Sequence, residues 1–308
     1  MDDCQPLWQD QSPVASAERT EHTPRPAAAS KLTLLRIRLS ARALNKLGKT
    51  PSMAPLVRLL RTHPIGKRVG HWLAGYRRPF PDLETAAREA QRFLGSTHHD
   101  KANAREHLRL SVEQRVSDYP VIFHLSKLEA PRHLFDLGGN FGNLFYCYAR
   151  YLPNTERMLW TVCDLPHVVE FGARVARHRH VDDRLRFTTD RTTANGADIF
   201  LVSGALHYFA EPLDRIIAGL ADRPRHVFVN RAPLADAPAI CTVQDAGFGL
   251  AACILHDRPS LIDGMKALGY SLIDEWAIHD MSLQIPLYPE RSAACYRGLY
   301  FRLDDASA

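Results

Sequence analysis

The chain reads Leu134-Phe135-Asp136-Leu137-Gly138-Gly139-Asn140-Phe141-Gly142 near its middle, an apolar run that ends in an acid and enters a glycine-rich turn. Such a run is typical of a buried strand, and glycines let the backbone turn tightly and approach a ligand closely. A helix that starts after this turn points its positive end at the ligand. The stretch therefore predicts the first strand, turn and helix of a ligand-binding α/β sheet.

A second acid follows the next apolar run, in Val162-Cys163-Asp164-Leu165-Pro166. Asp164 lies 22 positions after Gly142, close to the spacing of about 20 at which a carboxylate reaches the hydroxyls of a ribose. Either feature alone is a weak signal, because many glycines between a strand and a helix bind nothing. Together, on consecutive strands, they predict a crevice that binds a nucleoside.

Outward from this segment, short β-branched or aromatic runs alternate with helical windows, which is typical of parallel β-α-β units. We expect strands at 133–136, 158–164, 185–188, 198–203, 226–230, 270–278 and 294–303. We expect helices at 141–151, 168–177, 212–221 and 259–268. The sequence therefore predicts an α/β fold over residues 131–308, a doubly wound, mostly parallel seven-stranded sheet with an N-terminal helical extension.

The first 130 residues have a different composition. Residues 1–30 are rich in Pro, Ala, Ser and Gln, which predicts a disordered tail. Apolar residues spaced by three and four between Lys31 and Lys49 predict a basic amphipathic helix. A second apolar stretch at 54–60 follows, and a linker broken by Pro and Gly is expected after it, through Gly75 and up to residue 81. Asp82 is the expected N-cap of a helical cap over 82–130.

Positive charge is concentrated in this N-terminal part. No acidic residue lies between Glu21 and Asp82, and residues 31–81 carry twelve Lys and Arg, so the rest of a chain of net charge +5 carries −7. A basic arm on a mildly acidic body indicates a local anionic contact, not a nucleic-acid-binding fold. The partner is an acidic carrier protein or an anionic membrane surface, unless the arm packs on its own domain.

Other classes of protein find little support. No apolar run approaches the roughly 20 residues that cross a bilayer, and the start lacks the features of a secretory signal, so we expect a cytoplasmic protein, with peripheral membrane contact as an option. The six cysteines form no CxxC motif, and the neighbouring histidines lack the spacing of zinc ligands, so no metal is expected. No nucleophile elbow or Walker loop is present.

The glycine turn also favours one class of nucleoside. It lacks the middle glycine of the dinucleotide pattern G-x-G-x-x-G, which lets a pyrophosphate rest on the backbone. Asp136 would repel a diphosphate but can hold an ammonium group. S-adenosylmethionine carries an amino-acid head and no phosphate, so it fits this turn better than a nicotinamide dinucleotide.

These residues are similar to the D-x-G-x-G-x-G pattern of class I S-adenosylmethionine-dependent methyltransferases, with Asn140 in place of the middle glycine. From about residue 75 to the C-terminus the chain also resembles a family of uncharacterised bacterial methyltransferase-like proteins, through Leu201 to Tyr208, Val229 to Leu234 and Thr242 to Gln244. The resemblance implies methyl transfer to a small molecule or a carrier-linked biosynthetic intermediate, with an oxygen or nitrogen acceptor favoured over carbon.

Cofactor-binding residues follow from this resemblance position by position. The turn would frame the methionine part of the cofactor, through Asp136, Gly138, Gly139, Asn140 and Gly142. Asp164 would bind the ribose, and Leu165 would pack on the adenine. The resemblance also implies that Asp190 reaches the adenine amino group, unless it is a solvated loop acid, and that Ser203 with Gly204 ends the strand that brings substrate to the methyl group.

Acceptor-side residues are expected after the fourth, fifth and later strands. Methyl transfer depends mainly on positioning, but a hydroxyl or an ammonium acceptor must lose a proton, and histidine is suited to that task. His207 is the candidate base, unless it simply packs under the crevice. The candidates for binding the acceptor are Tyr208, Arg231, Gln244 and Asp245; Arg231 would pair with a substrate carboxylate or else tie two loops together.

Two other functions stay open at this point. A nicotinamide-dependent oxidoreductase would use the same crevice for a different nucleoside. A non-catalytic scaffold of the same fold would dock partners through the basic arm without turnover. The presence of both acids and of the glycine turn favours cofactor binding over the scaffold.

Overall fold

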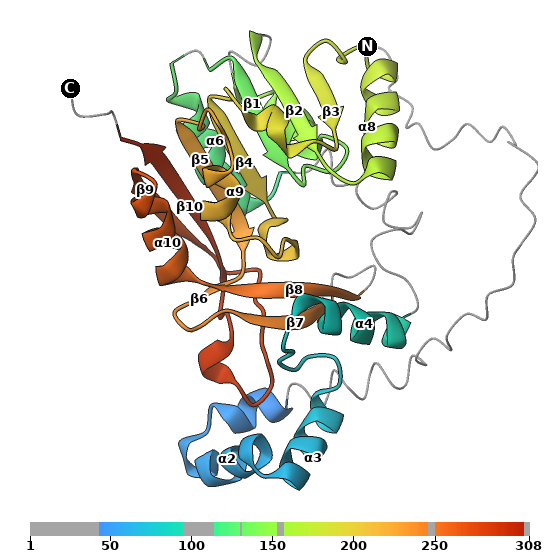
Figure 1. The fold of residues 1–308 in the computed structure, drawn as a ribbon, viewed down its shortest axis with the longest axis vertical. Coiled ribbons are helices and arrows are strands. Elements are labelled where there is room, and N and C mark those ends of the chain that lie inside the picture. Colours follow the sequence, from blue (N-terminus) through green and yellow to red (C-terminus); the bar gives the residue numbers. More distant parts are fainter. Residues whose placement is uncertain (1–42, 95–113, 130, 153–156, 246–249, 305–308) are drawn as a thin grey trace, which may run out of the picture.

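The computed structural model describes residues 43–94, 114–129, 131–152, 157–245 and 250–304, and seven of its strands form one sheet. They are β1 (His133–Leu137), β2 (Leu159–Cys163), β3 (Leu185–Thr188), β4 (Ile199–Ser203), β5 (His226–Ala232), β9 (Tyr270–Ile278) and β10 (Tyr296–Leu303). Their order is β3-β2-β1-β4-β5-β10-β9, and β10 is antiparallel to both of its neighbours (Figure 1). The predicted doubly wound, mostly parallel seven-stranded sheet is confirmed.

Helices cover both faces of this sheet. They are α6 (Tyr119–Ser126), α7 (Asn143–Tyr148), α8 (Pro166–His178), α9 (Leu213–Ala218) and α10 (Arg258–Ala267). Neighbouring residues of a strand point to opposite faces, so Leu134 packs among residues of α6 and α7 while Phe135 packs among residues of α9 and α10. Both strand residues are fully buried. This explains why the interior of β1 is apolar except for Asp136.

A second sheet lies beside the first. Its strands are β6 (Leu234–Ala235), β7 (Ile240–Asp245) and β8 (Leu250–Asp257), in the order β6-β8-β7. Helix α4 (Leu83–Leu94) packs on it through Ala86 and Ala90, which join Val243 in one buried cluster (Figure 1). Of these three strands, only β7 has a strand-like sequence of its own, at 240–243, whereas β8 has an apolar run with no clear period.

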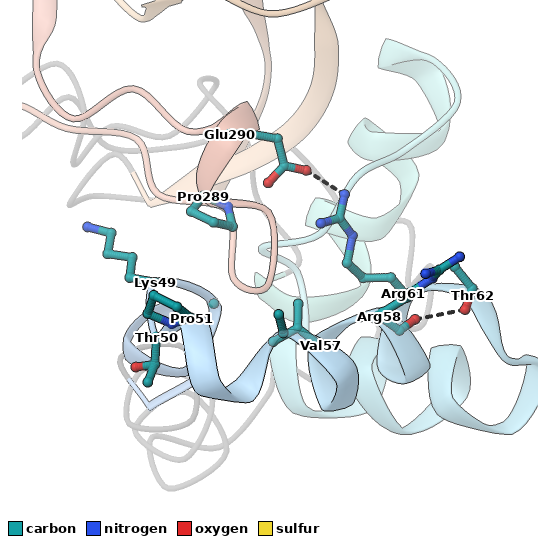
Figure 2. A pocket seen from close by; sticks show the side chains of 11 residues that line it. Lys49, Thr50, Pro51, Val57, Arg58, Arg61, Thr62, Pro289 and Glu290 are labelled. Atoms are coloured by element: carbon teal, nitrogen blue, oxygen red, sulfur yellow. Dashed lines mark hydrogen bonds and ion pairs between the residues drawn. The ribbon is translucent and has the colours of Figure 1, made fainter.

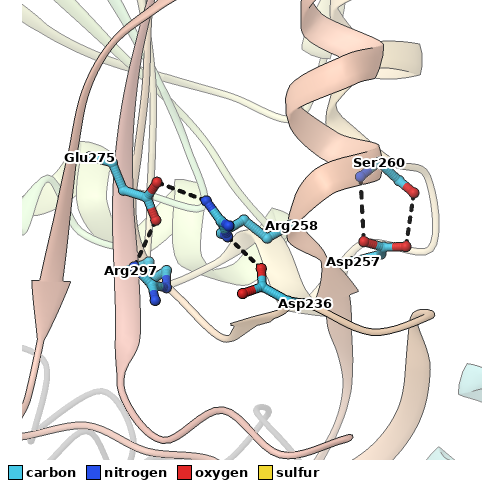
Figure 3. Close-up of polar contacts among 6 residues, drawn as sticks. All are labelled: Asp236, Asp257, Arg258, Ser260, Glu275 and Arg297. Carbon is cyan, nitrogen blue, oxygen red and sulfur yellow. Dashed lines mark hydrogen bonds and ion pairs between the residues drawn. The ribbon is translucent and has the colours of Figure 1, made fainter. Parts of the chain in front are cut away.

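Charged side chains connect the two sheets at their junction. Arg258 donates to Asp236, which follows β6, and to Glu275 of β9, at 2.6 and 2.9 Å. Arg297 of β10 donates to the other oxygen of Glu275 at 2.7 Å (Figure 3). Asp257 caps α10 by accepting from the backbone N–H and the hydroxyl of Ser260 (Figure 3). The start of α10 is thereby held against the edge of the main sheet.

The linker predicted after residue 60 is wrong over most of its length. Residues 54–74 form two helices, α2 (Ala54–Thr62) and α3 (Pro64–Ala74), at the end of the molecule away from the main sheet (Figure 1). Pro64 occupies the first turn of α3, where a proline costs no hydrogen bond. Gly66 does not break the helix, because it lets α3 approach α2: a Cβ there would lie 2.3 Å from the carbonyl oxygen of Leu59.

Other predicted helices differ at their ends or fall outside the described ranges. The helix predicted at 141–151 is shorter, because Gly142 in the left-handed region precedes its first turn. Asp82 is confirmed as an N-cap, since it accepts from the N–H of Thr85 at 2.6 Å. Of the predicted basic helix only residues from 43 onward are described, and 43–48 are helical. Among the residues that the structure describes, no helix is long and apolar enough to span a bilayer.

Candidate functional site

The glycine turn connects β1 to α7 at the carboxyl ends of the parallel strands. Its residues Gly138, Asn140 and Gly142 have φ angles of 72°, 55° and 80°. A side chain at the first of them would be strained and would also lie 2.4 Å from the Cβ of Ala205. Asn tolerates the left-handed region better than most residues, which accounts for Asn140. The turn therefore brings bare backbone to the edge of the sheet where ligands bind in this class of fold.

Asp164, directly after β2, connects that strand to the turn. Its Oδ2 accepts from the N–H of Asn140 at 2.9 Å, and its Oδ1 accepts from the N–H of Leu165 at 2.7 Å. Burial raises the pKa of this carboxyl, while the two backbone hydrogen bonds lower it. Each carboxylate oxygen retains a second lone pair for a ligand hydroxyl. Asp164 thus shapes the turn and lies beside it at the carboxyl ends of the strands.

Asp136, the fourth residue of β1, is completely buried beneath the turn. Its Oδ2 accepts from Trp160 Nε1 at 3.1 Å, whereas its Oδ1 has no hydrogen-bond partner among the described residues. The pKa of Asp136 is raised to about 7: burial is the main cause and the nearby charge of Asp164 adds to it, while the hydrogen bond from Trp160 acts in the opposite direction. A Cβ on Gly139 would lie 2.4 Å from Oδ2, so this glycine keeps the carboxyl open toward the turn.

Trp160 was not identified from the sequence as part of this site. The register explains its position, because Asp136 lies opposite Val162 and residues two apart on a strand share a face. The indole of Trp160 can therefore reach diagonally to the carboxyl of Asp136. Trp160 lies two positions before Val162, the residue that pairs with Asp136. This relation can be found only when the pairing of the two strands is known.

The other predicted cofactor residues lie at the ends of β2, β3 and β4. Leu165 is 44% exposed, as expected for a side chain that could cover a flat ring. Asp190 is exposed and caps a short 3-10 helix, accepting from the N–H of Thr192 at 2.8 Å. Ser203 ends β4, and its hydroxyl is buried with no hydrogen-bond partner among the described residues. The arrangement of Asp190 fits the loop-acid alternative, whereas Ser203 lies at the carboxyl end of β4, beside the glycine that precedes Ala205.

A polar cluster joins the loop after β4 to the second sheet. Gln244 of β7 donates through its amide to Nε2 of His207 at 3.2 Å and to the hydroxyl of Tyr208, and it accepts from the hydroxyl of Tyr296 at 3.0 Å. The rings of His207 and Tyr208 lie 4.2 Å apart. Because an amide N–H donates, Nε2 of His207 accepts and the imidazole is neutral in this arrangement. Burial raises the pKa of both tyrosines.

Arg231, near the end of β5, is engaged within the protein. Its guanidinium donates to Asp118 at 2.8 Å, and the side chains of the two residues are 10% and 2% exposed. Tyr148 also donates to Asp118, at 3.0 Å. The hydroxyl of Ser117 is a further, longer contact of Arg231 at 3.4 Å. Arg231 therefore ties two segments of the chain together, as in the second alternative given for it. Its partner Asp118 could not be identified from the sequence.

Asp245 ends β7 and is half-buried. A hollow of about 570 Å³ lies between α2 and the loop at 287–290, far from the strand ends, and includes Lys49, Arg58 and Arg61 in its lining (Figure 2). Within the described ranges, no group of three His, Cys, Asp or Glu side chains could hold a metal ion.

The comparisons with known proteins place the chain at the level of fold. No protein-family model matches the sequence. No curated protein matches it either. The resemblance to the bacterial methyltransferase-like family therefore stays a prediction.

Solved structures of similar fold share little sequence with the chain. The 1,6-didemethyltoxoflavin-N1-methyltransferase of Burkholderia thailandensis, with 1,6-didemethyltoxoflavin and S-adenosylhomocysteine bound, is 18% identical over 66% of this chain and 84% of that one, with a TM-score of 0.44. An O-methyltransferase family protein of the same organism is 19% identical over 68% of this chain and 62% of that one, with a TM-score of 0.43. The 4+2 cyclase SpnF is 15% identical over 68% of this chain and 86% of that one, with a TM-score of 0.41. These similarities concern the fold alone.

Proposed function

We propose that the protein is an S-adenosylmethionine-dependent methyltransferase. The observation that carries the proposal is the carboxyl of Asp136, buried under a glycine turn with one oxygen that no described residue satisfies. A buried polar atom without a partner is rare, and it points to a ligand donor at that position. An ammonium group satisfies it, and a diphosphate does not.

The residues around the turn fit this cofactor. Asp136 would receive the ammonium of the methionine part, and the backbone from Gly138 to Gly142 would lie against the methionine chain. Asp164 would accept from the ribose hydroxyls through its second lone pairs, with Leu165 over the adenine. Residues 131–308 form the cofactor domain in this proposal, and residues 82–130 cap it.

The cofactor, when bound, supplies a sulfonium methyl group for in-line displacement, and the protein contributes position. Ser203 lies at the strand end where the acceptor would enter, and Gln244 with Tyr208 would line the acceptor side. His207 is available as a base only if its hydrogen bond to Gln244 opens, because Nε2 is otherwise occupied. As the acceptor we propose an oxygen or nitrogen atom of a small molecule or a carrier-linked intermediate. We propose that the reaction takes place in the cytoplasm.

The first test is calorimetric titration of the full-length protein with S-adenosylhomocysteine and, in parallel, with NADH. We expect micromolar binding of S-adenosylhomocysteine and none of NADH. Asp164→Ala is expected to weaken that binding by at least about 100-fold, because charged hydrogen bonds to the ligand and the clamp on Asn140 are lost together.

Three outcomes separate the candidate functions. Binding of NADH in place of S-adenosylhomocysteine would identify an oxidoreductase. Binding of neither ligand would favour the scaffold. Asp190→Ala is the matched control, since Asp190 is an exposed acid after the neighbouring strand, and it is expected to retain affinity within about threefold, the change expected when no charged hydrogen bond is lost.

Affinity for S-adenosylhomocysteine is also expected to depend on pH through Asp136. The pKa of this carboxyl is raised to about 7, so at lower pH it is protonated and must lose its proton to pair with an ammonium. Affinity should therefore rise about tenfold per pH unit up to about pH 7 and level off above it. Titrations between roughly pH 5.5 and 8.5, in buffers of different ionisation enthalpy, would measure both the affinity and the proton released.

Asp136→Asn provides the control for this assignment. It keeps the shape of the side chain, and we expect weak binding that no longer changes with pH. The raised pKa of Asp136 also predicts how the stability of the protein changes with pH, in the direction opposite to the change in affinity. A raised pKa means that the folded protein holds the proton more tightly, so the contribution of Asp136 to stability is present at low pH and is lost between about pH 4 and 7. If the affinity of Asp136→Asn for S-adenosylhomocysteine still rose with pH as in the unaltered protein, the assignment of Asp136 would be contradicted.

A further inference from the structure

Helices α2 and α3 carry a set of large apolar side chains on their surface. Each member is at least 40% exposed: Leu56, Leu59, Ile65, Val69 and Trp72. On α3 the spacings of four and three place the last three on one face of the helix. We call these three residues the apolar stripe. Few soluble surfaces group so many large apolar side chains within one short segment.

The stripe is separate from the face that holds α3 in place. That face consists of small residues, Gly66, Gly70 and Ala74, which are all buried. A Cβ at Gly70 would lie 3.2 Å from the carbonyl oxygen of Leu60, so the two helices touch closely through it. The stripe is therefore not part of the packing that joins α3 to α2.

The charge around the stripe has a single sign. No acidic residue occurs between 43 and 81. Arg58, Lys67 and Arg68 are exposed, and no acid in the described part of the chain pairs with them. Among the cations of α2 and α3 in the described part of the chain, Arg61 alone is neutralised, by an ion pair with Glu290 (Figure 2). Exposed apolar side chains beside unpaired cations are typical of helices that lie in the interface of an anionic membrane.

We propose that the helical pair α2–α3 docks the protein on a bilayer that contains anionic phospholipid. The stripe enters the headgroup region, and Arg58, Lys67 and Arg68 contact lipid phosphates. The pair lies at one end of the molecule, away from the main sheet, so contact there leaves the strand ends unobstructed (Figure 1). A second copy of the chain would bring an equally basic surface to the same place, which disfavours self-association through it.

Sedimentation of the full-length protein with vesicles tests this proposal. We expect binding to phosphatidylcholine vesicles with roughly 30% phosphatidylglycerol, none to phosphatidylcholine alone, and weaker binding at high salt. Ile65→Ser/Val69→Ser is expected to weaken binding at least about tenfold through lost apolar contact. Arg58→Gln/Lys67→Gln/Arg68→Gln is expected to weaken it about 100-fold.

Matched variants elsewhere on the surface control for general effects. Phe123→Ser removes an exposed aromatic from α6, and Arg174→Gln/Arg177→Gln/Lys266→Gln makes the same change in net charge. Both should bind vesicles like the unaltered protein. Quenching of tryptophan fluorescence by brominated lipid should fall in Trp72→Phe, which places the stripe itself in the bilayer.

Several results would overturn the proposal. Variants of α2–α3 that bind vesicles as well as the unaltered protein would assign membrane contact to another segment. Loss of a dimer in Ile65→Ser/Val69→Ser would assign the stripe to a second copy. Capture of an acidic acyl carrier protein through α2–α3, without vesicle binding, would assign it to a protein partner.

Discussion

Gly138→Ala is expected to lower the free energy of unfolding by about 3 kcal/mol and to weaken S-adenosylhomocysteine binding at least about 100-fold. Two costs add at this position. The φ angle of 72° disfavours any side chain, and the new Cβ would lie 2.4 Å from the Cβ of Ala205. Ala205 follows β4 directly after Gly204, so relief of the clash must move the turn or the strand end. Urea unfolding and calorimetric titration measure the two effects.

Gly269→Ala separates the two costs. Gly269 has a φ angle of 88°, but the nearest atom to a Cβ there is 3.7 Å away, at the end of the Leu303 side chain. This variant carries the backbone strain without the clash, so it should lose about 1 kcal/mol and keep its affinity for S-adenosylhomocysteine. Equal losses in the two variants would show that Ala205 does not constrain the turn.

Arg231→Met is expected to destabilise the protein by about 3 kcal/mol, because it leaves the buried carboxylate of Asp118 without its cation. Tyr148 and the backbone N–H of Arg115 still donate to that carboxylate, at 3.0 Å each, which limits the loss. The loss should be largely recovered in Asp118→Leu/Arg231→Met, since the double variant removes both charges. Urea unfolding of the three proteins tests the pair.

An exposed ion pair provides the control for Arg231. Arg191 and Glu211 are 47% and 44% exposed in their side chains, so Arg191→Met should change stability by less than about 0.5 kcal/mol. If Arg231 instead binds a substrate carboxylate, Arg231→Met would leave stability unchanged and raise KM for the acceptor. The two readouts distinguish a positioning role from a binding role.

The sequence alone determined the main sheet and the position of the glycine turn. Strand periodicity, glycines and terminal acids are local properties, and they identified β1 and the acid at Asp164 before any contact was known. The strands at Leu185–Thr188 and Tyr270–Ile278 lie where they were predicted. The second sheet was not predicted as a sheet, because β8 acquires its strand conformation from pairing with β7 and not from its own composition.

Tertiary structure decided how the side chains are used. Asp118 and Arg231 are 113 positions apart, so no spacing rule could join them. Trp160 reaches Asp136 only through the register of β1 and β2. Gln244 occupies His207 from the second sheet. The glycines of α3, which locally indicate a linker, support a helix because close packing on α2 requires them. Local sequence selects backbone conformation, whereas the partner of a polar side chain depends on which distant segment the fold brings beside it.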